Sequence, residues 1–127
     1  MVGIEAGADM VMSTHMILSK IDRRLATASE IIIGQLLRDK LNFDGIIITD
    51  DLLMKGADTL GNYGERAMKA FKAGHDLLLF GKNYRATRKA IEYFKDEYRR
   101  GNLKDIRIRE SLERISGIKS RLSLMVP

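Results

Sequence analysis

A single stretch near the middle of the chain constrains the fold more than any other part of the sequence. It reads Gly45-Ile46-Ile47-Ile48-Thr49-Asp50-Asp51-Leu52-Leu53-Met54. A short apolar run without polar alternation is typical of a strand buried on both faces of a parallel sheet. Asp50 and Asp51 follow this strand, and ligands of α/β folds bind at the C-terminal edge of the sheet. A carboxylate held there can serve as a nucleophile, an acid/base group or a metal ligand.

Two other segments repeat the pattern of a glycine, an aspartate and a short apolar run. Ala6–Met12 is echoed by Ala73–Leu79, and in both the glycine ends a helical stretch, as expected of a residue that tolerates the left-handed conformation. Strands are therefore predicted to begin near Met10, Ile46 and Leu77. Their spacing of roughly 30 to 36 residues is the size of a βα unit.

Amphipathic stretches predict the helices. Ser29 is the predicted N-cap of a helix with Ile32, Ile33, Leu36 and Leu37 on one stripe. Three further helices are predicted, at 65–72, at 84–98 and at about 104–122. In the first, Ala67, Met68 and Phe71 face inward, and in the second, Ile91, Phe94 and Tyr98 recur at helical spacing. The third has an apolar face of Ile108, Leu112, Ile115, Ile118 and Leu122. The alternation of strands and helices predicts an α/β fold with a parallel sheet. We interpret Asp9, His75 and Asp76, which precede strands, as structural residues.

Composition excludes several function classes. The net charge of +5 comes from basic residues interleaved with acids at helical spacing, which is typical of solvated helix faces and not of a nucleic-acid interface. No run is long enough to span a bilayer and no signal peptide is visible, so we expect a cytoplasmic protein without a membrane partner. The absence of cysteine excludes disulfides and cysteine-based zinc sites.

Two long connections, 15–28 and 52–64, follow the first two strands, where functional loops belong. Neither holds a glycine-rich phosphate-binding fingerprint. Paired acids after a buried strand also occur in receiver domains that hold Mg²⁺. That alternative is disfavoured, because Gly81-Lys82 matches the pattern only in part and the order of elements is two strands short.

The segment Phe43–Ala57 resembles the nucleophile segment of glycoside hydrolase family 3. In the β-N-acetylhexosaminidase branch this strand ends in Ser/Thr-Asp-Asp-Leu/Ala-x-Met, whereas in the β-glucosidase branch a Trp more often follows the first Asp. Asp51 and Met54 therefore favour the hexosaminidase branch. The resemblance extends to the flanking segments Ala8–His15, Ser29–Asn42 and Ala73–Leu79, and so to nearly the whole chain.

This resemblance implies a fold and a site. Residues 1–127 would be a single partial domain, the C-terminal portion of a (β/α)₈ TIM barrel with about three βα units and a final helix. Asp50 would be the nucleophile of a retaining glycosidase, which forms a covalent glycosyl-enzyme. His15, Asp51 and Met54 would form the substrate-binding set, with Asp51 turned away from Asp50 toward backbone donors. The resemblance implies no metal and no cofactor.

The same comparison shows what the sequence lacks. The family's acid/base, a His paired with an Asp, and most of its sugar-binding residues lie upstream of the nucleophile strand. The family's Pro-Ala-Ser segment reads Leu25-Ala26-Thr27-Ala28-Ser29 here, without the proline. Two functions therefore stay open: hydrolysis of terminal N-acetylglucosaminide bonds, or an inactive fragment or split-gene subunit. The second would act with a complementary chain or as a homo-oligomer, because three strands cannot close a barrel and their edges invite pairing.

Overall fold

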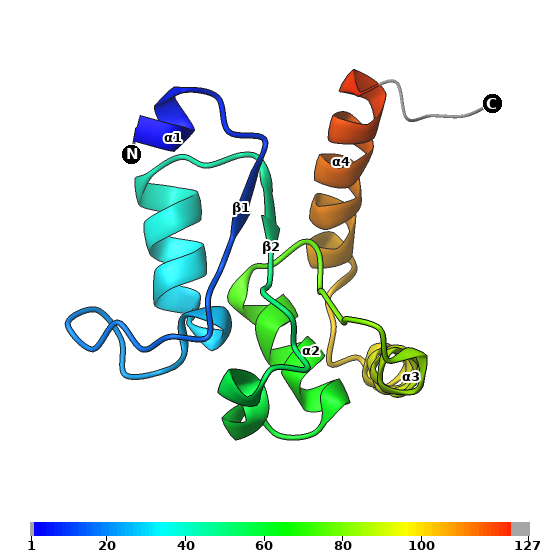
Figure 1. Cartoon of the computed structure of the whole chain (residues 1–127). Coiled ribbons are helices and arrows are strands. Elements are labelled where there is room, and N and C mark those ends of the chain that lie inside the picture. The colour runs from blue at the N-terminus through cyan, green and yellow to red at the C-terminus, as the bar shows by residue number, and fades with distance from the viewer. Residues whose placement is uncertain (1, 123–127) are drawn as a thin grey trace.

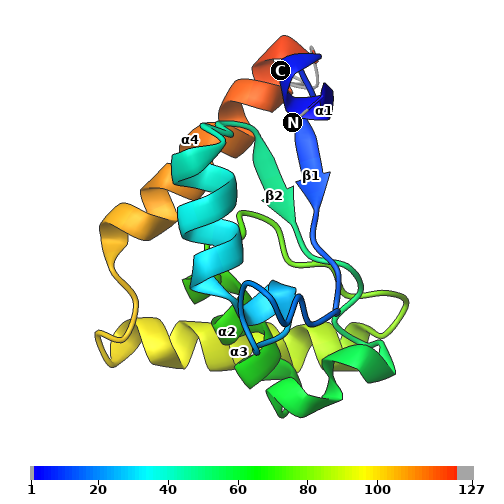
Figure 2. The same ribbon diagram turned by 90° about the vertical axis from the view of Figure 1, so that its left-hand side faces the viewer.

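The computed structural model describes residues 2–122. Its centre is a two-stranded parallel sheet of β1 (Met10–Met12) and β2 (Ile46–Ile48). Both strands run away from the short helix α1 (Val2–Glu5), so their C-terminal ends lie at the same edge (Figures 1 and 2). The predicted parallel α/β class is confirmed.

The third predicted strand is present only as a single parallel bridge between Leu77 and Ile48. The prediction located the segment correctly but overstated its regularity. The physical reason is Thr49, whose hydroxyl accepts the backbone N–H of Leu79 at 2.9 Å. A side chain thus takes the place of a backbone partner, and the ladder does not continue.

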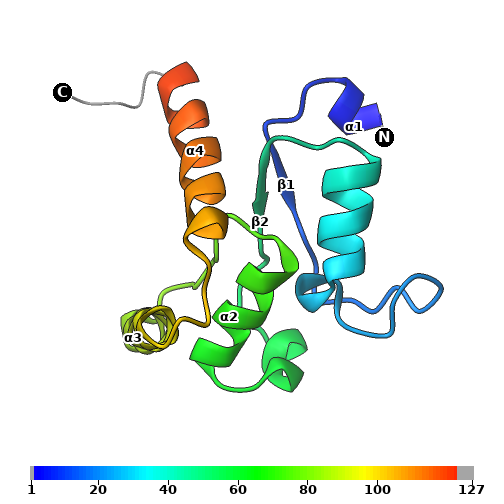
Figure 3. The same cartoon turned by 180° about the vertical axis from the view of Figure 1, so that it is seen from behind.

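Helices surround this sheet. They are η1 (Ala26–Ala28), η2 (Ile31–Lys40), η3 (Lys55–Leu60), α2 (Tyr63–Ala73), α3 (Tyr84–Arg99) and α4 (Asp105–Arg121). η2, drawn in cyan, and α4 lie on opposite sides of the sheet, while α3 crosses the end of the molecule away from α1 (Figures 1, 2 and 3). Among residues 2–122, no helix is long and apolar enough to cross a lipid bilayer.

The local sequence explains where these helices begin and end. The π-helix η2 has Glu30 as its N-cap, one residue after the predicted Ser29, but the Ser29 hydroxyl still accepts the N–H of Ile32 in its first turn at 3.0 Å. Asn62 and Glu65 form a reciprocal capping box at the start of α2. Gly74 ends α2 with a φ of +126°, a left-handed conformation that favours glycine.

Apolar packing forms two clusters. The first joins η1, η2, β2 and the end of α2 through Ala26, Ile32, Ile33, Phe43, Ile47 and Ala73. The second joins α2 to the loop before α4 through Met68, Phe71 and Leu103, and the rings of Phe71 and Phe94 pack edge to face with their centroids 5.0 Å apart. Ile46 and Ile47 are 3% and 0% exposed, and successive strand residues face opposite sides, so β2 is buried on both faces as predicted.

The predicted apolar faces of α3 and α4 are only partly buried. Ile118 of α4 is buried, whereas Leu112 and Leu122, the residue just past the end of α4, are each 56% exposed. The buried residue next to Leu112 is Ser111, whose hydroxyl donates to Asp76 at 2.7 Å. α4 therefore packs through polar groups as well as through Ile108 and Ile118, and part of its apolar stripe stays open. On α3, Ala86 and Ala90 are buried while Ile91 is 50% exposed.

Candidate functional site

Asp50 lies just beyond β2, at the C-terminal edge of the sheet, and is half-buried. Its Oδ1 accepts the backbone N–H of Asp51 at 2.7 Å. Its Oδ2 makes no hydrogen bond to the residues that the structure describes. One carboxylate oxygen is therefore fixed by the backbone, and the other has no hydrogen bond among the described residues, an arrangement that suits a nucleophile or a ligand-binding group.

Asp51 turns away from Asp50, as expected of two adjacent carboxylates. Its Oδ1 accepts the N–H of Leu53 at 2.9 Å and the N–H of Gly81 at 3.0 Å. A Cβ at Gly81 would lie 2.6 Å from the Asp51 Oδ2, so a larger residue there would displace this carboxylate. Asp51 thus joins the loop after β2 to the segment that follows Leu77.

His15 reaches this loop from the connection after β1. Its Nδ1 lies 2.7 Å from the hydroxyl of Thr27, and its Nε2 lies 3.0 Å from the backbone carbonyl of Asp51. A carbonyl oxygen only accepts, so Nε2 carries the proton. Both ring nitrogens are therefore engaged by protein groups. Thr27, fully buried, was not singled out from the sequence; a threonine in the segment before a helix gives too common a signal.

Met54 begins the turn of η3, and its side chain is 48% exposed. Its N–H donates to the carbonyl of Asp51 at 3.0 Å, which closes a tight turn over residues 51–54. The structure thus brings Asp50, His15 and Met54 together at the backbone of Asp51. Their assignment as nucleophile and sugar-binding residues stays a prediction.

Arg66 of α2 holds the loop after β2 and was missed by the sequence reasoning. Its guanidinium donates to the carbonyls of Leu52 (2.9 Å) and Gly61 (2.7 Å) and to the carboxylate of Asp58 (2.8 Å). The glycine-rich loop therefore bends around a side chain of the protein itself. In the sequence, this role is indicated by a charged residue next to Ala67 on the buried stripe of α2.

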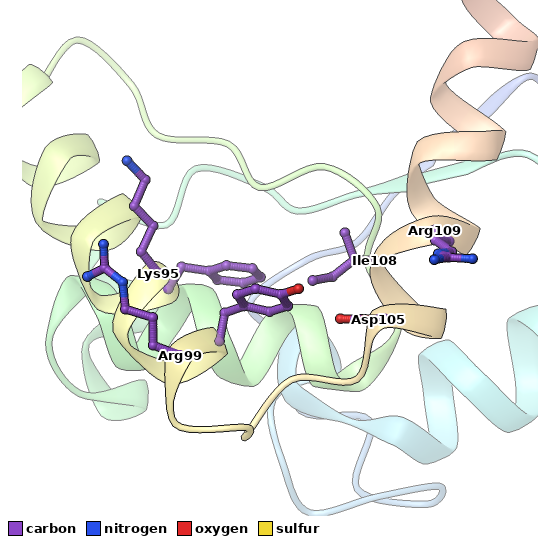
Figure 4. Close-up of a pocket in the computed structure, with 7 residues that line it drawn as sticks. Lys95, Arg99, Asp105, Ile108 and Arg109 are labelled. Atoms are coloured by element: carbon purple, nitrogen blue, oxygen red, sulfur yellow. The ribbon is translucent and has the colours of Figure 1, made fainter.

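A surface hollow of about 560 Å³ lies between the end of α3 and the start of α4 (Figure 4). Lys95, Arg99 and Arg109 line it, and a hydrogen bond to Asp105 raises the pKa of Tyr98 there. None of the site residues predicted from the sequence lines this hollow. Among residues 2–122, no group of three or more His, Asp or Glu side chains is placed to hold a metal ion.

Known proteins are similar to this chain in sequence and in fold. A β-hexosaminidase from Haemophilus influenzae (strain PittEE) is 51% identical over 71 residues, which are 56% of this chain and 20% of that protein. The structure of a glycoside hydrolase family 3 β-N-acetylglucosaminidase from a Paenibacillus species matches with a TM-score of 0.92 and 30% identity, over 98% of this chain and 24% of that one. A β-N-acetylhexosaminidase from Beutenbergia cavernae matches with a TM-score of 0.83 and 28% identity, over 93% and 35% of the two chains.

The matched part of this chain thus spans about a fifth of the length of such curated relatives. The family model for the glycosyl hydrolase family 3 N-terminal domain matches residues 1–118. The family's domain is of the TIM-barrel type, and the parallel sheet with its flanking helices forms part of such a domain. Motif, fold and comparison agree, and the chain belongs to glycosyl hydrolase family 3.

Proposed function

We propose that this chain carries the nucleophile of a retaining glycosidase that acts on terminal β-N-acetylglucosaminides, with Asp50 as the nucleophile. The observation that carries the proposal is the carboxylate of Asp50, held at the C-terminal edge of the sheet by a single backbone hydrogen bond. The relatives named as β-N-acetylglucosaminidase and β-hexosaminidase support the choice of sugar.

The chemistry would proceed in two displacements. An oxygen of Asp50 attacks the anomeric carbon, the bond from that carbon to the leaving oxygen breaks, and a glycosyl ester forms on Asp50. Water then attacks the same carbon and releases the sugar and the carboxylate. An acid must protonate an ordinary leaving group, which contributes on the order of 10²–10⁴-fold. Because the sequence contains no match to the family's acid/base pair, we expect this chain by itself to be slow on ordinary glycosides.

A substrate whose leaving group needs no proton isolates the role of Asp50. With 2,4-dinitrophenyl N-acetyl-β-D-glucosaminide, we expect release of dinitrophenolate and a glycosyl adduct on Asp50 detected by peptide mass spectrometry. Asp50→Ala should abolish the adduct, and azide should restore dinitrophenolate release. Asp44→Asn, at an exposed carboxylate before β2, is the matched control and should behave like the wild type. Turnover that survives Asp50→Ala without azide would remove the catalytic role.

A second candidate function is that of a subunit that acts only with a complementary chain. An apolar groove of about 510 Å³ beside the 77–80 segment favours this subunit function. Its lining includes Leu78, Phe80, Ile91, Phe94, Leu112 and Ile115. A strand segment that lacks a regular partner beside an apolar groove is suited to pairing with another strand. The test is to mix this chain with a chain that carries the remaining barrel strands. A higher rate of hydrolysis of an ordinary glycoside would support the subunit function, and glycosylation of Asp50 without such a partner would contradict it.

A further inference from the structure

We infer that His15 is a positioning residue that acts on Asp50 through the backbone of Asp51, and does not bind the sugar. The inference rests on the proposed role of Asp50 as nucleophile. It is drawn from a continuous run of hydrogen bonds that joins the loop after β1 to the carboxylate of Asp50.

The peptide groups of Asp51 are held from two sides. The N–H of Asp51 donates to the Oδ1 of Asp50 at 2.7 Å, and the carbonyl of Asp51 accepts from the Nε2 of His15 at 3.0 Å. The direction of the N–H fixes one oxygen of Asp50 and so sets where the other oxygen points. The same carbonyl also accepts the N–H of Met54 at 3.0 Å. Loss of the His15 bond therefore leaves this carbonyl with the Met54 bond alone, and the looser Asp51 backbone holds the Asp50 carboxylate less precisely.

Thr27 holds the other side of the imidazole. Its buried hydroxyl lies 2.7 Å from the Nδ1 of His15 and 3.1 Å from the carbonyl of Thr14. Gly56 packs on the same residue, since a Cβ there would lie 3.0 Å from the Cβ of His15. Both ring nitrogens therefore have a protein partner, and neither can reach a sugar hydroxyl without giving that partner up.

The consequence for the reaction concerns the rate of attack and not the binding of the sugar. Displacement of a reacting atom by about 1 Å can lower a rate by the order of 100-fold. A misplaced Asp50 would lower the maximal rate of glycosylation. A His15 that contacts the sugar would instead change the substrate concentration at half-maximal rate.

Two pairs of variants separate these roles. His15→Phe removes both hydrogen bonds, whereas His15→Gln keeps an N–H that can reach the Asp51 carbonyl. Thr27→Val removes the hydroxyl in a nearly isosteric side chain, whereas Thr27→Ser keeps it. With 2,4-dinitrophenyl N-acetyl-β-D-glucosaminide, we expect His15→Phe and Thr27→Val to lower the maximal glycosylation rate by at least about ten-fold at an unchanged half-saturation concentration. His15→Gln and Thr27→Ser should recover most of that rate.

Amide hydrogen exchange of Asp51 and Leu53, followed by NMR, gives a readout that needs no turnover. We expect exchange to speed up in His15→Phe and Thr27→Val and to stay unchanged in Thr59→Ala, an exposed residue of η3 outside this run of hydrogen bonds. Unchanged exchange, or an unchanged maximal rate, or a raised half-saturation concentration would each overturn the inference. Absence of glycosylation in the wild type would overturn the proposed function. The amide hydrogen exchange rates alone would then decide whether His15 holds the Asp51 backbone.

Discussion

At the scale of single residues, Asp9 and Asp76 show how one sequence pattern leads to two environments. Both follow a helix that ends at a glycine and precede an apolar run. The carboxylate of Asp76 is fully buried, accepts from Arg38 and lies 3.1 Å from Arg114 and 3.7 Å from Arg107. Burial lowers the pKa of both Arg38 and Arg107, which marks how strongly this cluster is withdrawn from water.

The side chain of Asp9, by contrast, is 52% exposed and pairs with Arg121 at 2.7 Å. Asp76→Asn would leave guanidinium groups around a neutral side chain, and we expect it to lower the free energy of unfolding by about 3–5 kcal/mol. Asp9→Asn breaks an exposed pair and should lower it by less than about 1 kcal/mol. Urea unfolding at pH 7 measures both; equal losses would show that the Asp76 cluster does not stabilise the fold.

His75 is buried and neutral, with both ring nitrogens satisfied. Its Nδ1–H donates to the carbonyl of Ala70 at 2.9 Å, and its Nε2 accepts from the hydroxyl of Ser13 at 2.7 Å. Burial lowers the pKa of His75 from 6.5 to about 4. This agrees with the structural role expected of it from the sequence.

Stability should therefore depend on pH through His75. Between pH 6.5 and pH 4 the unfolded chain binds a proton that the folded chain does not, so the free energy of unfolding falls as the pH is lowered through this window. The loss attributable to His75 is roughly 3 kcal/mol. Urea unfolding at pH 7 and pH 4.5 should show a steeper decline for the wild type than for His75→Asn. Parallel declines would mean that His75 does not titrate between the folded and unfolded states.

At the scale of elements, a glycine allows two helices to pack closely against each other. α2 and α3 pack together at Gly64, where a Cβ would lie 2.2 Å from the ring of Tyr93. Gly117 lies within α4, and a Cβ there would meet no atom within 4 Å. The two glycines therefore differ in what an added methyl group would do, although both stand in helices.

The substitutions Gly64→Ala and Gly117→Ala should change the free energy of unfolding in opposite directions. The first forces α2 and α3 apart and should lower the free energy of unfolding by about 1–3 kcal/mol. The second removes backbone freedom from the unfolded chain without a clash and should raise it by about 0.5–1 kcal/mol. Thermal melts followed by circular dichroism compare the two; a stabilising Gly64→Ala would show that Tyr93 does not pack as described.

At the scale of the whole molecule, apolar surface remains uncovered on one side. The groove beside the 77–80 segment, about 510 Å³, continues onto Ile91 of α3 and Leu112 of α4, which are 50% and 56% exposed. Exposed apolar surface next to an open strand favours association with another chain. Ser111 of α4 is buried against Asp76, whereas its neighbour Leu112 faces the groove.

We expect the purified chain to self-associate as its concentration rises. The double variant Ile91→Glu/Leu112→Glu should reduce this association, because it places charges in the groove. Ile106→Glu, at a 61% exposed position of α4 outside the groove lining, is the control and should leave it unchanged. Light scattering over a concentration series measures the outcome. A wild-type chain that stays monomeric would count against the groove as an interaction surface.

The sequence by itself determined the parallel α/β class, the position of β2 and the bounds of α2, α3 and α4 to within about two residues, because these follow from local periodicity and capping. It also identified the family through the motif around Asp50 and Asp51. Tertiary structure decided what depends on contacts between distant residues: the hydrogen bonds of His15 to Thr27 and Asp51, the hold of Arg66 on the loop after β2, and the burial of Asp76 but not Asp9. No local pattern encodes which polar groups meet across more than ten residues, since packing selects those pairs only once the elements have come together.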